Sequence, residues 1–296
     1  MTTVIDVAPL DRAVDAALAS RDHSGLHVIG YGEITSVLAW PDADGPWACK
    51  RLPIFDTIER LDAYRARFDE YVATLRGRGV RVQESRLEVV AKEHGFTAYI
   101  VQPAIEPDHL GPAVLRDAGD REGRALLMAV MDHISAVASP TVGLDAQLSN
   151  WACPHGELTY FDISTPMLRD ASGRDLLDTE LFLSSLPALL RPVVRRFLLS
   201  SILDQFFTSR ATALDLAANL YKERLSAWVP VTIEIANERL GLDPPLTVDE
   251  TRRYYRRDMR VWGALQTVRR LDREWQQRIR RRPYPWLLPG RINRSL

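Results

Sequence analysis

The fold is decided by the stretch Gly143-Leu144-Asp145-Ala146-Gln147-Leu148-Ser149-Asn150, followed shortly by Leu158-Thr159-Tyr160-Phe161-Asp162-Ile163-Ser164. Asp145 and Asn150 are five positions apart, and Asp162 follows a short apolar strand. Carboxylate and amide oxygens are the hard ligands that magnesium prefers, and protein-bound magnesium is usually shared with substrate phosphates. Asp145 is placed where a carboxylate can accept the proton of a hydroxyl group. Turn formation or helix capping would explain each residue separately but would leave their order unexplained.

Upstream of this stretch, two strands flank a glycine turn. The segment from Ile29 to Val37 reads IGYGEITSV, with Gly30 and Gly32 in the turn. Glycine lets the backbone come close to an anion, and the amide groups of such a turn point at phosphate oxygens. A glycine turn is more often only a hairpin, so this segment alone leaves both interpretations open.

The next predicted strand carries Ala48 and Lys50 on one face, because side chains alternate along a strand. The small Ala48 leaves room for the flat base of a nucleotide, and Lys50 places an ammonium group near the phosphates of that nucleotide. A surface lysine at a strand end is the ordinary alternative. The chain has only two other lysines, Lys92 and Lys222, among many arginines. This bias favours a specific role for Lys50, since a compact ammonium does what a planar guanidinium cannot.

The distribution of strand and helix patterns predicts an α+β fold. Strands are expected over residues 27–29, 34–40, 47–52, 87–92 and 96–101, with a helix over 56–76 between the third and fourth strands. After Pro103 helices dominate, over 121–138, much of 176–209, 211–228 and 231–240. The predicted regions are an N-terminal lobe (1–103), a helical C-terminal lobe (104–246), and a basic amphipathic helix with an extended tail (247–296).

Together, these motifs resemble those of the protein-kinase-like superfamily, and most closely the aminoglycoside and choline phosphotransferases. GYGEITSV is similar to the glycine-rich loop GxGxxGxV, with Val37 retained and Thr35 in place of the third glycine. Ala48-Cys49-Lys50 resembles the AIK of the third strand. Asp145 and Asn150 match the DxxxxN of the catalytic loop, and Asp162 matches the metal-binding Asp of DFG. The resemblance covers residues 27–165.

The resemblance implies a two-lobed fold that binds ATP and Mg²⁺ and transfers phosphate to the hydroxyl of a small molecule. It implies that Lys50 holds the α- and β-phosphates, oriented by Glu70 on the helix 56–76, with Asp69, Glu59 and Asp62 as alternatives. Asn150 and Asp162 would hold the metal, and Asp145 would be the base or would orient the acceptor. The nucleotide would be surrounded by Gly30, Gly32, Val37, Ala48 and Gln102, with the backbone of 100–104 contacting adenine.

Three features of the sequence depart from the family pattern. Gly143 stands where the catalytic loop has a supporting histidine, and Ile163 and Ser164 replace Phe and Gly after the metal-binding Asp. The segment after Asp162 lacks the activation segment of protein kinases, which favours a small-molecule acceptor. The alternative to an enzyme is a degenerate pseudokinase that binds nucleotide, or only a partner protein.

The last predicted helix is rich in arginine. Thr247 and Glu250 form a capping box, and the helix is expected to end before Pro283. From residue 252 onward there are fourteen arginines and three acids. Nucleic acid, an anionic membrane surface or a partner protein are alternatives to a simply solvated face, which we favour. The reason is an apolar stripe at core spacing, formed by Tyr255, Met259, Trp262, Leu265, Val268, Trp275 and Ile279.

Composition supports a globular, cytoplasmic protein. The chain has 296 residues, of which 46% are hydrophobic, and a net charge of -1. We find no signal-peptide pattern and no apolar run of the roughly 18 residues that a membrane span needs. The two cysteines, Cys49 and Cys153, fit neither a disulfide framework nor a zinc site.

Overall fold

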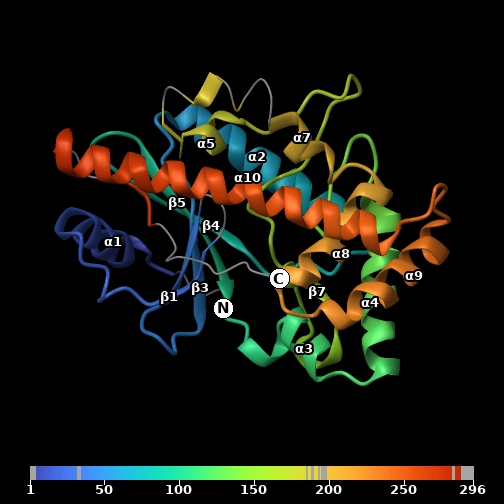
Figure 1. The fold of residues 1–296 in the computed structure, drawn as a ribbon. Coiled ribbons are helices and arrows are strands. Elements are labelled where there is room, and N and C mark those ends of the chain that lie inside the picture. Colours follow the sequence, from blue (N-terminus) through green and yellow to red (C-terminus); the bar gives the residue numbers. More distant parts are fainter. Residues whose placement is uncertain are drawn as a thin grey trace.

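A computed structural model describes residues 5–31, 35–184, 186–187, 190–192, 194, 199–281 and 284–287. The N-terminal lobe is built on five antiparallel strands: β1 (Val28–Tyr31), β2 (Ser36–Trp40), β3 (Trp47–Arg51), β4 (Arg86–Ala91) and β5 (Phe96–Pro103). Their order in the sheet is β1-β2-β3-β5-β4. A mostly helical lobe follows (Figure 1). The predicted two-lobed α+β class is therefore confirmed, and the strands begin and end close to the predicted positions.

The central strand of the sheet, β3, positions Lys50. In the two flanking ladders Lys50 lies opposite Val37 of β2 and Ile100 of β5. Because β2 and β5 flank Lys50 on both sides, its backbone is held in place. Its side chain extends from the face of the sheet that is turned toward the helical lobe.

Helix α2 (Ile58–Gly77) covers this face and begins where Thr57 accepts a hydrogen bond from the backbone N–H of Arg60. Its buried face consists of residues three or four apart: Leu61, Tyr64, Phe68, Tyr71 and Leu75. These side chains belong to one core cluster that also contains Ile100 of the sheet and Leu127 of the helical lobe. The two lobes thus share a continuous apolar core.

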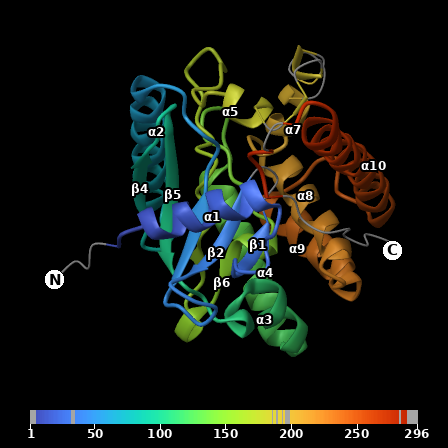
Figure 2. The same cartoon turned by 90° about the vertical axis from the view of Figure 1, so that its left-hand side faces the viewer.

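The opposite face of the sheet is covered by α1 (Ala8–Ser20), which the sequence analysis did not predict. Figure 2 shows α1 crossing the sheet. Leu10 and Val14 of α1 pack in a second core cluster with sheet residues that include Leu38 and Cys49. Asp11, which is 1% exposed, accepts a hydrogen bond of 2.8 Å from the Tyr99 hydroxyl. A buried carboxylate is tolerated here because it is hydrogen-bonded.

The helical lobe packs around α4 and α8. Its described elements are α3 (Gly111–Asp117), α4 (Asp120–Val137), the hairpin β6 (Trp151–Ala152) and β7 (Thr159–Tyr160), α5 (Glu180–Leu183), α7 (Leu199–Asp204), α8 (Ser209–Lys222) and α9 (Val229–Leu240). Helices were expected over much of 176–209, and the described residues of that range form the short helices α5 and α7. Several residues of that range lie outside the described part of the chain.

Helix α10 (Val248–Glu274) continues into a π-helical turn (Trp275–Ile279). Thr247 accepts a hydrogen bond from the backbone N–H of Glu250, as the capping box predicts. The helix runs along the outside of the molecule from α9 to the side of α1 (Figure 1). It packs against α8, and further along the Arg21 guanidinium donates to the carbonyl of Gln277 at 3.1 Å. The segment α10 therefore contacts both lobes.

The predicted apolar stripe of α10 is only partly confirmed. Tyr255 is buried, but Trp275 and Ile279 are 56% and 63% exposed. The polar residues Gln266 and Arg269 are buried instead. In the second half of α10 the inward side lines the cavity with Gln266 and Arg269, so polar side chains are buried there while Trp275 and Ile279 are exposed. Among the described residues, no helix is both long and apolar enough to cross a membrane.

Removing the Asp11 carboxylate tests whether α1 is an integral part of the N-terminal lobe. Asp11→Ala leaves the buried Tyr99 hydroxyl without its acceptor and should lower the free energy of unfolding by about 1–3 kcal/mol. Asp11 and Asp15 both contact Lys92. The Asp15 side chain is exposed, so the control Asp15→Ala should change the free energy of unfolding by less than about 0.5 kcal/mol. Urea unfolding measures both, and equal losses would contradict this role of α1.

Candidate functional site

A cavity of ≈ 920 Å³ lies between the two lobes. Eight of the ten site residues expected from the sequence line it: Gly30, Val37, Ala48, Lys50, Gln102, Asp145, Asn150 and Asp162. Gly32 lies outside the described residues, and Glu70 does not line the cavity. The sheet supplies the first five of these residues, and the loops after α4 and after β7 supply the other three.

Lys50 and Asp162 connect the two sides of the cavity. The Lys50 ammonium donates to Asp162 Oδ1 at 2.7 Å. The backbone N–H and the hydroxyl of Ser164 donate to the same oxygen, at 3.3 and 2.9 Å. Burial opposes the charged form of Asp162, but the charge of Lys50 and these hydrogen bonds outweigh it and lower the pKa of Asp162 below its usual value. Asp162 is thus held as a carboxylate, and its Oδ2 takes part in none of these bonds.

The expected pairing of Lys50 with Glu70 is not formed, because Lys50 pairs with Asp162 and Glu70 with Arg67. Glu70 lies on the solvent side of α2, where its carboxylate pairs with Arg67. The fallback acids Asp69, Glu59 and Asp62 are also exposed. The side of α2 that reaches the cavity presents Tyr64, whose hydroxyl donates to the carbonyl of Ser164 at 2.9 Å. The apolar spacing along α2 could have shown that its acids face outward.

The catalytic-loop segment and the strand before Asp162 are joined by the β6–β7 hairpin, in which Trp151 pairs with Tyr160. The backbone N–H of Phe161 donates to the Asn150 carbonyl at 3.1 Å, which brings Asn150 beside Asp162. The side-chain amide of Asn150 donates to the Asp145 carbonyl at 3.2 Å. Since its NH₂ group is used in this way, Asn150 presents its Oδ1 as an acceptor.

Gly143 is supported without a histidine side chain. The Tyr71 hydroxyl donates to the Gly143 carbonyl at 3.0 Å, and the Gly143 N–H donates to the Met167 carbonyl at 2.8 Å. A Cβ atom at Gly143 would lie 3.0 Å from Met167 Cβ, 3.2 Å from Phe207 Cε2 and 3.3 Å from Phe206 Cβ. The space that a side chain would need is already filled by these neighbours.

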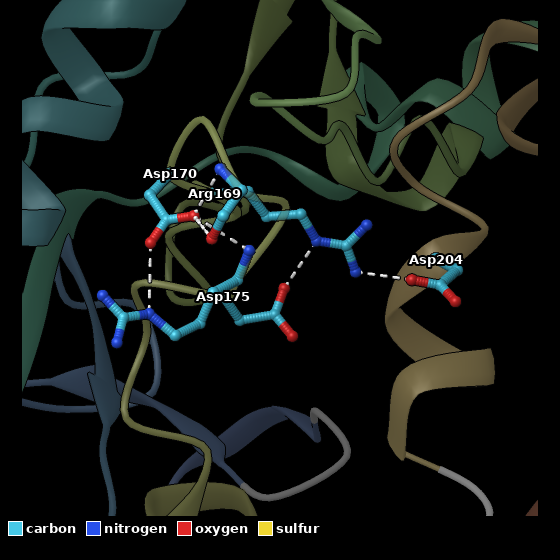
Figure 3. A network of polar contacts seen from close by, with 6 residues as sticks. Arg169, Asp170, Asp175 and Asp204 are labelled. Carbon is cyan, nitrogen blue, oxygen red and sulfur yellow. Dashed lines mark hydrogen bonds and ion pairs between the residues drawn. The ribbon is translucent and has the colours of Figure 1, made fainter.

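An arginine network holds the segment after Asp162 against these phenylalanines. Arg169 donates to Asp175 at 2.7 Å and to Asp204 of α7 at 2.6 Å (Figure 3). Its guanidinium carbon lies 3.7 Å from the centroid of the Phe207 ring. Charge-assisted hydrogen bonds and a cation–π contact thus fix this segment beside the start of the catalytic loop.

A second buried carboxylate, Asp215 on α8, lies near Asp145 and was missed in the sequence. Asp215 accepts hydrogen bonds from the Tyr254 hydroxyl at 2.8 Å and from the Gln147 amide at 3.2 Å. Burial, followed by the charges of Asp215 and Asp162, raises the pKa of Asp145 well above the usual range of an aspartate. A signal existed, since Asp215 is a lone charge within the apolar helix pattern around Leu214 and Leu216.

The rest of the cavity wall is largely apolar. Helix α10 contributes Trp262 and Leu265 to it, together with the buried polar residues Gln266 and Arg269. The apolar side chains from the region of α5 and α7 are Leu177, Leu181, Leu183, Leu186, Val194, Ile202, Leu203 and Phe206. The cavity therefore has a polar end around Asp145 and Asp162 and an apolar wall beside it.

The strand end expected to contact adenine has few free donors. Pro103 has no N–H, and the N–H of Ala104 donates to the Pro46 carbonyl at 2.8 Å. The side-chain amide of Gln102 donates to the hydroxyl of Ser85 and to the carbonyl of Phe161, both at 2.9 Å. Gln102 thus joins the strand end to the segment before Asp162, and Pro103 and Ala104 can offer a base only their carbonyl groups.

The sheet order, the helical second lobe and the cavity between the lobes form the two-lobed α+β arrangement of a kinase-like fold. The chain belongs to the family described as "Family of unknown function (DUF6206)", which matches residues 9–273. A search of curated proteins gave no match. Among solved structures, the chain is similar to an aminoglycoside phosphotransferase in the GDP and kanamycin complex of APH(2")-IIia. The identity is 10%, the TM-score is 0.35, and the match covers 73% of this chain and 93% of that one. The class assignment therefore rests on the fold itself.

Substituting histidine at Gly143 tests how the catalytic loop is supported. Gly143→His should lower the free energy of unfolding by about 1–3 kcal/mol, because the new side chain meets Met167, Phe206 and Phe207. Gly263 of α10 has nothing within 4 Å of its Cβ position, so Gly263→His is the control and should stay within about 0.5 kcal/mol. If chemical denaturation finds Gly143→His as stable as the wild type, the packing explanation is wrong.

Proposed function

We propose that this chain is an ATP- and Mg²⁺-dependent phosphotransferase that acts on the hydroxyl of a small molecule. The observation that carries the proposal is the meeting of Lys50, Asp145, Asn150 and Asp162 at the polar end of one cavity between the lobes. Kinase-like phosphoryl transfer needs few covalent steps from the protein and depends on positioning and charge neutralisation. These four side chains have the chemistry for both tasks.

The donor set fits a magnesium ion. Asn150 Oδ1 and Asp162 Oδ2 are hard oxygen ligands of the kind that Mg²⁺ shares with phosphates, and Asp162 is held in its charged form. When bound, the ion would neutralise charge on the phosphates that are transferred and left behind. Lys50, which already lies beside Asp162, would bind the phosphates from the side of the sheet. The glycine-rich segment around Gly30 would cover them.

Asp145 would orient the acceptor hydroxyl and take its proton. The pKa of Asp145 is raised by burial and by neighbouring carboxylates, which brings its basicity closer to what a base needs near neutral pH. The acceptor would be a small molecule, since α10 closes one side of the cavity. The apolar wall formed with Trp262 and Leu265 favours an acceptor that carries an apolar body as well as a hydroxyl.

The second candidate is a pseudokinase that binds nucleotide without transferring phosphate. Two observations favour it: Gly143 replaces the catalytic-loop histidine, and no acid of α2 reaches Lys50. The hydrogen bonds of Tyr71 and Asp162 compensate for both changes in the free protein, so we place the enzyme first. Nucleotide binding and ATP consumption separate the two candidates.

Nucleotide binding is tested first, by calorimetry with ATP and Mg²⁺. Lys50→Ala and Asp162→Asn should each weaken binding by at least about tenfold, since charge-assisted contacts to phosphate contribute roughly 1.5–3 kcal/mol each. Glu70→Gln is the control and should change the affinity less than about twofold, because Glu70 lies outside the cavity. Loss of binding in Glu70→Gln would restore the expected Lys50–Glu70 pair. Absence of nucleotide binding in the wild type would refute the proposal.

Phosphate transfer is tested with Asp145→Asn. ATP consumption with a panel of hydroxylated acceptors should fall by about 10² to 10⁴, the contribution of a positioned general base, while ATP affinity stays within a few-fold. The isosteric amide keeps the hydrogen bond from the Gln147 N–H, so the loop should remain folded. Nucleotide binding without consumption by the wild-type protein across the panel would favour the pseudokinase.

A further inference from the structure

The outer face of α10, continued by the π-helical turn after it, is basic over its first part and carries exposed apolar side chains toward its end. Residues at successive steps of three or four positions share one side of a helix. On the outer side they are Arg253, Arg257, Arg260, Ala264, Thr267, Leu271, Trp275 and Arg278, all of which are exposed. Arg252, Arg256, Ile279, Arg280 and Arg281 are exposed as well. We call this set the outer face of α10.

The positive charge of this face is not balanced within the described structure. Of its eight arginines only Arg278 has an acidic partner among the described residues, Glu274. The acids between residues 252 and 281 are Asp258, Asp272 and Glu274, and none of them is classed as exposed. A helix face that is only solvated does not need its positive charges separated from negative ones, since exposed helices usually carry both signs of charge.

The apolar part of the face is equally distinct. Leu271, Trp275 and Ile279 lie four residues apart and are 65%, 56% and 63% exposed. They are three of the seven large apolar side chains that are exposed in the described part of the chain. Three such side chains in one row form an apolar ridge beside the arginines. Single exposed apolar side chains scattered over a surface need no explanation, but a row of them does.

We propose that the outer face of α10 docks on an anionic lipid bilayer. An interfacial helix combines arginines that meet acidic headgroups with a tryptophan and aliphatic side chains that enter the boundary of the acyl chains. The outer face has both components along one straight element. The helix would lie in the plane of the membrane surface, with the folded protein on the side of its inner face.

The aliphatic ridge distinguishes a bilayer from nucleic acid. A duplex offers phosphates to arginines, but Leu271 and Ile279 would find no apolar phase along its backbone. Nucleic-acid surfaces that bind single strands present aromatic side chains on which bases stack, and Trp275 is the only aromatic residue of the outer face. Nucleic-acid binding is therefore an outcome of the test and not the proposal.

Docking would place the cavity next to the bilayer. The inner side of α10 carries Trp262, Leu265, Gln266 and Arg269, which line the cavity, while its outer side would face the lipid. An amphipathic acceptor could then reach the site from the membrane surface. The docking proposal itself does not depend on catalysis, because its test measures only binding.

Cosedimentation with vesicles tests the proposal on the full-length protein at about 0.1 M salt. The wild type should bind vesicles of phosphatidylglycerol mixed with phosphatidylcholine and should not bind phosphatidylcholine alone. The triple variant Arg253→Gln/Arg257→Gln/Arg260→Gln should lower the partition coefficient by roughly 100-fold, since each arginine near an anionic surface contributes about 1 kcal/mol. Leu271→Ser/Trp275→Ser should lower it by about tenfold or more.

Matched controls separate position from composition. Arg12→Gln/Arg65→Gln/Arg76→Gln removes the same charge from exposed positions elsewhere, and Ile54→Ser/Ile58→Ser removes exposed apolar side chains elsewhere. Both should bind like the wild type. The proposal is overturned if the protein does not bind the anionic vesicles, if the Leu271 and Trp275 variant binds them unchanged, or if a DNA duplex of about 20 base pairs displaces the protein from them. Thermal unfolding without vesicles verifies that each variant is folded.

Discussion

The ion pair between Lys50 and Asp162 is the interaction on which the rest of the site depends. It joins the central strand of the N-terminal sheet to a loop of the helical lobe at 2.7 Å, across 112 positions of sequence. Taking two charges out of water is costly unless each is also hydrogen-bonded. Here both side chains are only partly buried, with exposed fractions of 14% and 29%, and two additional bonds from Ser164 stabilise the Asp162 carboxylate. The pair therefore joins the two lobes and also keeps Asp162 in its charged form.

The same constraint explains how the chain manages without two polar residues of the kinase pattern. A carboxylate on α2 is not needed to hold Lys50, because Asp162 holds it directly, and α2 can turn the aromatic residues Tyr64 and Tyr71 inward. A histidine at Gly143 is not needed, because backbone bonds and the Phe206 and Phe207 side chains fill its place. Packing thus takes the place of polar side chains on α2 and around Gly143. Packing holds these residues in one position only if the side chains packed against them are themselves held in place. The network around Arg169 supplies that fixation.

Sequence reasoning succeeded where local patterns and chain order agree. Alternation placed Lys50 on its strand, and the order of Asp145, Asn150 and Asp162 brought them to one cavity, although their roles there stay predictions. It failed for Glu70 because the family pattern was given priority over the apolar spacing of α2, which already turned every acid of that helix outward. It missed α1, since its docking depends on contacts with residues such as Tyr99 that lie far along the chain. Asp215 was overlooked although it interrupts an apolar helix pattern, because its partners Tyr254 and Gln147 lie on other elements and only the fold brings them together.

The apolar periodicity of helix α10 predicted a stripe packed on the helical lobe, and the structure shows a different arrangement in the second half of the helix. A stripe at core spacing was expected to pack on the helical lobe, and it does so in the first half of α10, where Tyr255 is buried against Tyr221 of α8. In the second half its inner side lines the cavity with Gln266 and Arg269, while Trp275 and Ile279 are exposed. Among the described residues, α10 thus has one side that lines the cavity and another side that is exposed. Under the two proposals, its inner face would limit what can enter the site, and its outer charge would determine what kind of surface the protein can approach.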